Sequence, residues 1–361
     1  MSHEIFALRP WLTNAHPLPN APVGMLGRTE AKFFYHLAKD AFTGRGTIVD
    51  AGSFLGKSAY CFAKGLQANP MFDSSRHRVH CFDNFLVNEV GTIDFICHQL
   101  GQKMSLGEST REIFERQVAP VRDLLEVHEG DFHVMPWQHQ PIEILMIDIA
   151  KSESLGKRVV EVFFPDLVPG LSIVGHQDYH HPWLPHIHVV MEYLADCFQL
   201  VAPRLDDSAG FVLTREIPAE MLRRAVDYDF SIAEQIALMD RAVERLPVED
   251  RHVVELARLT LRLAANDWMD VRAEFESVER RNTHRTEDAT WVRYVDGMRN
   301  SVDQSEGWQQ RNLGHFERSL QLADNLIARG CNNSHVLSLR AASLGGLGRH
   351  GEAELVYREA L

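Results

Sequence analysis

Short apolar runs alternate with longer amphipathic stretches between residues 46 and 216, and this pattern predicts strands that alternate with helices. Such alternation builds a doubly wound, mainly parallel sheet with helices on both faces. We therefore expect an α/β fold with seven strands. The strand candidates are residues 46–52, 78–83, 124–131, 142–148, 171–178, 197–203 and 210–216.

Two segments depart from this regular alternation. Only "RLDDSA" (204–209) separates the last two strand candidates, which predicts a hairpin with one antiparallel strand at the edge of the sheet. Residues 84–123 are longer than an ordinary crossover, and their middle, "LGQKMSLGES", is polar and holds two glycines. We expect residues 84–123 to form a lid-like insertion.

The strand pattern stops after about residue 220, and the chain from 229 to 361 has a helical pattern. "LGHFERSL" (313–320) and "GRHGEAEL" (348–355) resemble each other at an offset of 35 residues, and "NDWMDVRAEF" (266–275) is a weaker third copy. This period resembles that of tetratricopeptide-type helix hairpins; an irregular helical bundle is the alternative. The predicted domains are 1–220 and 229–361.

Composition places the chain among globular proteins, with 45% hydrophobic and 24% charged residues in 361. A formal net charge of −13 argues against a nucleic-acid partner. No apolar run is long enough to span a membrane, and the N-terminal "MSHEIFALRPWLTNAHPLP" does not read as a secretory signal. The five cysteines have no paired spacing, so we expect reduced thiols and a cytoplasmic protein.

The stretch "TIVDAGSFLGKS" (47–58) is the first candidate for chemistry, because a glycine-bearing turn joins a strand to a helix there. Such a turn lets a ligand approach the backbone, and the helix start offers free N–H groups to an anionic group. Asp83 ends the next strand, where an acid commonly binds ribose hydroxyls. The turn is not Gly-x-Gly-x-x-Gly, which disfavours a dinucleotide.

Residues 20–216 resemble class I S-adenosylmethionine-dependent methyltransferases, with the macrocin-type and catechol-type O-methyltransferases as the most similar groups. The resemblance implies S-adenosylmethionine as cofactor. Its ribose would be bound by Asp83, and its adenine would lie beside Asp131 of "EGDF". The turn would hold its amino-acid end through Asp50, Gly52, Ser53, Gly56 and Ser58.

Both groups of enzymes use a divalent metal, and two further motifs resemble their metal site. "MIDIAKS" supplies Asp148 as a ligand and Lys151 as a catalytic base, and "VGHQDY" supplies Asp178 as a second ligand. Mg²⁺ held by carboxylates would lower the pKa of an acceptor hydroxyl and shift the lysine toward its neutral form. Gln177 and Tyr179 stand where the families carry a further acid or amide, so the resemblance supplies no third ligand.

Histidines cluster in "HQDYHHPWLPHIH" (176–188). His180 or His181 is a candidate catalytic base or metal ligand. Contact with substrate and plain packing are the alternatives for this segment.

These patterns predict an O-methyltransferase for a hydroxyl on a small or glycosylated acceptor. A second hypothesis is an iron-dependent hydroxylase of the cephalosporin-hydroxylase type, with iron held by the His/Asp cluster. A third is a non-catalytic protein that binds a partner through its helical region, which could also form a homo-oligomer.

Overall fold

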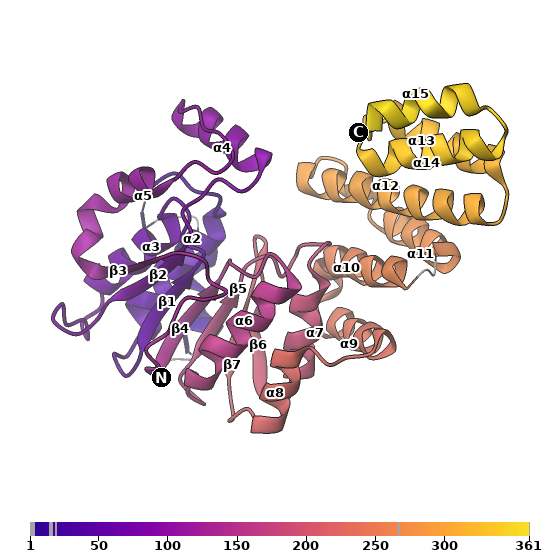
Figure 1. Cartoon of the computed structure of the whole chain (residues 1–361). Coiled ribbons are helices and arrows are strands. Elements are labelled where there is room, and N and C mark those ends of the chain that lie inside the picture. The colour runs from indigo at the N-terminus through magenta and orange to yellow at the C-terminus, as the bar shows by residue number, and fades with distance from the viewer. Residues whose placement is uncertain (1–3, 14–16, 19, 266–267, 361) are drawn as a thin grey trace. The chain divides into compact units, whose positions relative to one another are not determined.

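The computed structural model describes residues 4–13, 17–18, 20–265 and 268–360. The chain divides into two compact units, shown in Figure 1. The sheet unit comprises Met1–His180 and His186–Asp229, and the helical unit comprises His181–Pro185 and Phe230–Leu361.

A seven-stranded sheet forms the centre of the sheet unit, in the order β3-β2-β1-β4-β5-β7-β6. Every pairing from β3 to β5 is parallel, and β7 pairs antiparallel with both β5 and β6. The predicted mainly parallel sheet and the seven strand positions are confirmed. The strands are β1 (Thr47–Ala51), β2 (Val79–Asp83), β3 (Leu125–Glu129), β4 (Ile142–Ile147), β5 (Ile173–His176), β6 (Phe198–Leu205) and β7 (Ser208–Leu213).

The predicted hairpin forms, but its antiparallel strand does not lie at the edge of the sheet. The antiparallel strand β7 sits between β5 and β6, and β6 is the edge strand. The crossover after β5 places β6 one position further out, and the short turn at Asp206 then returns the chain into the gap. Asp206 adopts the left-handed conformation, with φ 54°, that such a tight turn requires.

The direction of the strands decides where a ligand site can lie. All residues of β1 and β4 are buried, as expected for central parallel strands covered on both faces. Strand order reverses between β1 and β4, because β2 and β3 follow on one side of β1 and β5 on the other. This reversal fits a Rossmann-like α/β fold, in which the carboxyl ends of the strands border a crevice at this point.

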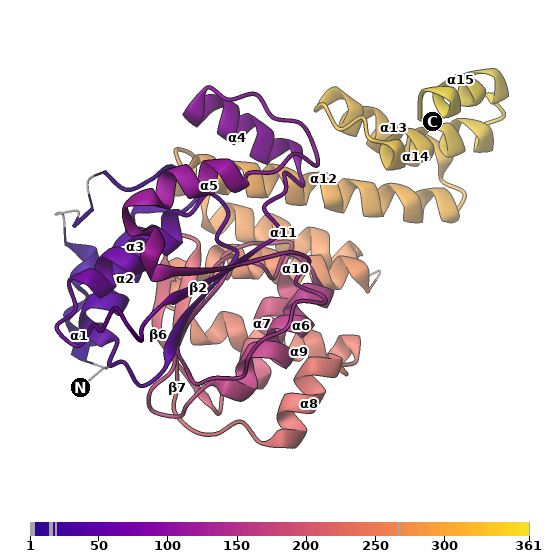
Figure 2. The ribbon, with the colours of Figure 1, turned by 60° about the vertical axis from the view of Figure 1, so that its left-hand side comes forward.

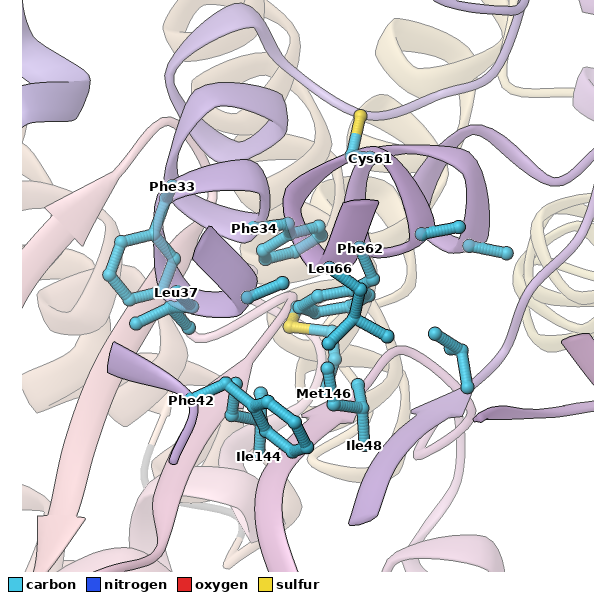
Figure 3. Close-up of a cluster of buried hydrophobic side chains, with 14 of the residues drawn as sticks. Phe33, Phe34, Leu37, Phe42, Ile48, Cys61, Phe62, Leu66, Ile144 and Met146 are labelled. Atoms are coloured by element: carbon cyan, nitrogen blue, oxygen red, sulfur yellow. The ribbon is translucent and has the colours of Figure 1, made fainter. Parts of the chain in front are cut away.

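Helices cover both faces of the sheet, and Figure 2 shows α2 and α3 on the opposite side from α6 and α7. In Figure 3, Phe34 of α2 and Phe62 of α3 lie over Ile48, Ile144 and Met146 of the sheet. The two phenylalanine rings stack at 4.9 Å. The unit contains α1 (Glu4–Leu8), η1 (Pro10–Leu12), α2 (Arg28–His36), η2 (Leu37–Ala41), α3 (Lys57–Gln67), α4 (Val90–Leu100), α5 (Arg111–Val118), η3 (Ala119–Leu124), α6 (Glu153–Phe163), η4 (Phe164–Asp166), α7 (Pro185–Tyr193) and α8 (Ala219–Asp227).

The segment from 84 to 123 forms α4, α5 and most of η3. Ile96 of α4 and Ile113 of α5 pack with Leu55, which belongs to the turn after β1. The Phe54 ring also lies 6.3 Å from that of Phe95. The insertion therefore covers part of the turn after β1.

The helical unit is built from consecutive helices joined by short turns. α13 and α15 begin 34 residues apart, at Phe316 and His350, and the turns before them place Gly314 and Gly348 at positive φ. The structural offset is thus 34 residues, one less than the sequence comparison indicates. The unit contains α9 (Ile232–Arg245), η5 (Val248–Asp250), α10 (Arg251–Ala264), α11 (Trp268–Arg281), η6 (Thr283–Arg285), α12 (Ala289–Asn312), α13 (Phe316–Ala328), α14 (Ser334–Gly346) and α15 (His350–Ala360).

The extra residue in the sequence alignment is Gly351, which makes the second copy one position longer before its glutamate. Burial follows the structural offset, since Ser319 and Leu322 are buried in α13 as Ala353 and Val356 are in α15. The sequence comparison pairs Leu320 with Leu355 instead, and Leu355 is 66% exposed. Among the described helices of the chain, none is both long and apolar enough to cross a membrane.

Candidate functional site at the carboxyl edge of the sheet

The turn after β1 is organised around the carboxylate of Asp50. Ser53 and Ser58 each donate a side-chain hydrogen bond of 2.8 Å to its Oδ2. Its Oδ1 is buried and has no hydrogen-bond partner among the described residues. Burial raises the pKa of Asp50 to about 6 against the lowering effect of the two hydroxyls. The site therefore contains a buried acceptor that a ligand donor could satisfy.

Gly52 allows the turn after β1 to lie directly against the backbone at the end of β4. It has φ 108°, and a Cβ there would lie 2.8 Å from the carbonyl carbon of Asp148. The turns after β1 and β4 thus meet backbone to backbone, which only glycine permits.

Gly56 has a different structural role from the one expected for a cofactor-binding glycine. A Cβ at Gly56 would lie 2.5 Å from Val118, and its N–H donates to the carbonyl of Ser53 at 2.7 Å. The missing side chain at Gly56 therefore allows α5 to pack on the start of α3. The structure does not aim this backbone N–H at the pocket.

Asp83 binds the same turn from the end of β2. Its two carboxylate oxygens accept hydrogen bonds from the backbone N–H groups of Phe54 at 2.7 Å and Phe85 at 2.6 Å. Burial raises its pKa although these hydrogen bonds oppose the shift. Each carboxylate oxygen can accept a further hydrogen bond, so the anchored group retains acceptor capacity.

Asp131 lies at the same edge of the sheet, since the neighbouring Gly130 N–H donates to the carbonyl of Asp83 at 3.0 Å. Its side chain is 66% exposed. It accepts hydrogen bonds from the backbone N–H and the Nδ1 of His133, and these lower its pKa. The structure brings Asp83 and Asp131 to one edge, with one side chain buried and the other open to solvent.

The two predicted metal ligands share one partner. The Lys151 ammonium donates short hydrogen bonds to the carboxylates of both Asp148 and Asp178. Burial lowers the pKa of Lys151, but the two carboxylates outweigh that effect and the net pKa is raised. Lys151 is therefore protonated in this arrangement and occupies the space between the carboxylates that a divalent cation would take.

Asp178 reaches Lys151 from an unfavourable backbone conformation. It has φ 57°, in the left-handed region that aspartate adopts more readily than most residues. The preceding Gln177 N–H continues the sheet by donating to the carbonyl of Ile147 at 2.8 Å. Strained backbone at the end of a central strand is typical of functional positions.

A small pocket lies beside Asp50 and Asp148, and Asp83, Asp131, Lys151 and Asp178 do not line it. It is lined by side chains or backbone of the turn after β1, by Met146, Asp148 and Gln177 of the neighbouring strand ends, and by residues 24–26. Its volume is about 30 Å³, room for one or two water molecules. Lys57 fixes the covering segment by donating to the carbonyl of Leu26 at 2.7 Å. A nucleotide requires several hundred Å³, more than this pocket offers.

Sequence reasoning missed this covering segment. Glu30, which follows the segment, does not line the pocket. Glu30 is 1% exposed and accepts hydrogen bonds from the Gly27 N–H and the Ser208 hydroxyl. No local sequence pattern marks the covering role, because it depends on the contact of Gly24 with Lys57, where a Cβ at Gly24 would lie 2.6 Å from Lys57 Cβ.

The histidines of the 176–188 segment are mostly bonded to backbone carbonyls. His180 pairs with the carbonyl of Pro203 at 2.8 Å, His186 with Ala150 at 3.0 Å and His188 with Tyr179 at 2.6 Å. Burial lowers the pKa of His180 to about 4 and that of His188 to about 3, so both rings are neutral at pH 7. This arrangement ties loops together and leaves His180 buried in the sheet unit.

His181 belongs to the helical unit. Its ring packs edge-on against Trp183 and Tyr294, each at 5.6 Å. A cavity of about 800 Å³ lies in the helical unit, between α14, α15 and the turn after α12, and none of the predicted site residues line it.

The sheet order and the strand-end residues together define a Rossmann-like α/β unit with a polar pocket at its carboxyl edge. No known family model matches the chain, and no curated protein matches its sequence significantly. Geometry and chemistry alone therefore carry the functional argument.

Proposed function

We propose that the protein is an S-adenosylmethionine-dependent methyltransferase that acts on a hydroxyl of a small or glycosylated acceptor. One observation carries the proposal. The glycine turn with Asp50 meets the carboxylate of Asp83 at the carboxyl edge of adjacent parallel strands, beside the reversal of strand order.

The residues present fit the cofactor chemically. The unpaired Oδ1 of Asp50 offers a buried acceptor for the ammonium of the amino-acid end. Asp83 has acceptor capacity left for ribose hydroxyls, and the exposed Asp131 lies where an adenine edge would follow. Entry of the cofactor into this pocket would require displacement of residues 24–26, which Lys57 tethers through hydrogen bonds to the carbonyls of Gly24 at 3.5 Å and Leu26 at 2.7 Å.

When bound, S-adenosylmethionine would supply a methyl group on a sulfonium for in-line displacement by the acceptor oxygen. The protein would contribute mainly position, by holding the acceptor against the methyl carbon and excluding water. The acceptor proton must leave to a base. Lys151 can take it only after losing its own proton, which its two carboxylate partners disfavour.

Asp148 and Asp178 are the residues that would hold Mg²⁺, because both direct carboxylate oxygens to one point. Bound there, Mg²⁺ would supply a positive charge that lowers the pKa of an acceptor hydroxyl. Lys151 would then leave its place between the carboxylates, and its pKa would fall beside the cation. The short tether between Asp148 and Lys151 keeps the amine near the site.

Calorimetry on the full chain tests the cofactor assignment. S-adenosylmethionine and S-adenosylhomocysteine are titrated with and without Mg²⁺, and NAD⁺ serves as the control nucleotide. We expect one equivalent of S-adenosylhomocysteine to bind and NAD⁺ not to bind. Absence of binding by both sulfur nucleotides would overturn the proposal.

The other two hypotheses have weaker support. The histidines that would hold iron for a hydroxylase are mostly bonded to backbone carbonyls, so no specific observation favours that reaction. For the helical unit, we infer tetratricopeptide-like hairpins from the 34-residue offset of α13 and α15. A protein partner or a second copy would bind in the cavity beside α14 and α15. Deleting residues 230–361 should then abolish such binding.

A further inference from the structure

A second group of metal-ligating side chains lies at the β3 edge of the sheet. His80 of β2 is paired with Glu126 of β3. Two residues further along the same strands, Phe82 is paired with His128. Alternate residues of a strand share a face, so His80, Glu126 and His128 project from the same side of the sheet. One ligand atom from each lies within 4.8 Å of the others.

The separations within this group are close to those between ligands of one metal ion, although the two imidazoles also lie at hydrogen-bond distance from each other. His80 Nδ1 lies 3.1 Å from His128 Nε2 and 3.6 Å from a Glu126 oxygen, and the other Glu126 oxygen lies 3.7 Å from His128 Nε2. The carboxylate is thus just beyond hydrogen-bond distance of both rings. Tetrahedral ligands about 2.05 Å from zinc lie about 3.3 Å apart, whereas octahedral ligands at about 2.1 Å lie about 3.0 Å apart.

The surroundings orient both imidazoles. Phe82 stacks on His128 at 4.3 Å, and Trp137 packs edge-on against His80 at 5.3 Å. The Gln140 amide lies 3.1 Å from His80 Nε2. The amide nitrogen of Gln140 is the atom that faces His80 Nε2. Turned by 180°, the amide would present its oxygen, accept the Nε2 proton and leave Nδ1 free for a metal, as outer-shell partners of metal-bound histidines do.

We propose that His80, Glu126 and His128 bind a zinc ion, with water as the fourth ligand. The donor set of two imidazoles and one carboxylate is one that zinc accepts. Side-chain exposure rises from 7% at His80 to 22% at His128 and 44% at Glu126, so the fourth position faces solvent. The ion would cross-link the edge strand β3 to β2, independently of the proposed methyl transfer.

Zinc binding by the chelator-treated full chain tests this assignment, with Zn²⁺ measured by competition against a chromophoric chelator. We expect about one equivalent in the parent protein and at least a tenfold weaker affinity in both Glu126→Gln and His128→Gln. Two control variants leave the three proposed ligands in place. Asp178→Asn tests whether zinc binds at the Asp148 and Asp178 carboxylates instead. His36→Gln removes a different histidine, one that pairs with Asp40. Both control variants should bind zinc as the parent does.

The structure also gives readouts that do not depend on the loss of a ligand. Zn²⁺ should raise the melting temperature of the parent but not that of Glu126→Gln, whose half-exposed side chain leaves the fold intact. Co²⁺ in the site should absorb visible light with the intensity of a four-coordinate ion. No bound zinc in the parent, unchanged affinity in both ligand variants, or the weak absorption of six-coordinate Co²⁺ would overturn the proposal.

Discussion

The backbone N–H of Phe54 donates a hydrogen bond of 2.7 Å to the carboxylate of Asp83. This bond fixes the turn after β1 to the end of β2. It also holds Phe54 at φ 45°, a conformation that bulky residues rarely adopt. Asp83 thus organises the turn in addition to its proposed contact with ribose.

Replacing Asp83 should separate these two roles. Asp83→Ala leaves two N–H groups without their acceptor, so the free energy of unfolding in urea should fall by about 1–3 kcal/mol. Asp83→Asn keeps one acceptor oxygen and should lose less stability, while calorimetry should still show weaker S-adenosylhomocysteine binding. The exposed Asp131→Ala should change stability by less than about 0.5 kcal/mol. Parent-like stability of Asp83→Ala would contradict the anchoring role.

Gly52→Ala should destabilise the sheet unit strongly. The new Cβ would lie 2.8 Å from the Asp148 carbonyl carbon, and φ 108° is unfavourable for alanine. We expect a loss of more than about 2 kcal/mol in urea unfolding. Gly91→Ala is the matched control, because it lies in α4 with no atom within 4 Å of its Cβ position. That change should be neutral or stabilise by up to about 1 kcal/mol, and equal losses in the two variants would count against the close approach.

Stability should fall as the pH rises through the range in which Asp50 titrates. The group has an ordinary pKa of 3.8 and a folded pKa of about 6, so the folded state binds the extra proton in that window. Its contribution is complete below pH 3.8 and is lost as the pH passes 6, a change of about 3 kcal/mol for about two pKa units. Urea midpoints at pH 4 and pH 7 for the parent and Asp50→Asn give the difference. Identical pH profiles of stability for the parent and Asp50→Asn would refute the raised pKa of Asp50.

Lys151→Met should increase the response of the protein to Mg²⁺. The variant leaves the carboxylates of Asp148 and Asp178 facing one vacated position, at a cost of about 1 kcal/mol because the lysine is half-exposed. Mg²⁺ should then raise the melting temperature more than it does in the parent. Lys157→Met removes an exposed lysine 3.9 Å from Glu153 and should respond as the parent does. Equal Mg²⁺ responses in all three proteins would exclude a cation site at the two aspartates.

The sheet was predictable because the central strands carry apolar runs such as "ILMI" (144–147), and the segments between them are long enough for helices. The position of β7 could not be predicted, because a hairpin pattern specifies which two strands are joined but not where in the sheet they insert. The repeat offset was wrong by one residue for a related reason. Gly351 lengthens the second copy, and only the turn glycines and the buried positions reveal the register.

The strand-end acids were predictable because parallel strands bring their carboxyl ends to one edge. What those acids bind in the folded chain depends on side-chain geometry, and the ion pairs of Lys151 or the backbone anchors of Asp83 leave no trace in local pattern. The sequence analysis missed the group of His80, Glu126 and His128, because their proximity depends on the register between β2 and β3. The available signal was a spacing of two residues, which places His80 and Phe82 on one face of β2 and Glu126 and His128 on one face of β3.

The floor and the cover of the pocket come from different parts of the chain. Strand ends that also hold the sheet together form the floor, whereas residues 24–26, which precede the first strand, form the cover. Within the cover, Leu26 packs in the core and Gly24 against Lys57, whereas Met25 is 52% exposed and can change without disturbing the framework. Divergence at Met25 would therefore change what enters the pocket sooner than it changes the strand ends beneath it.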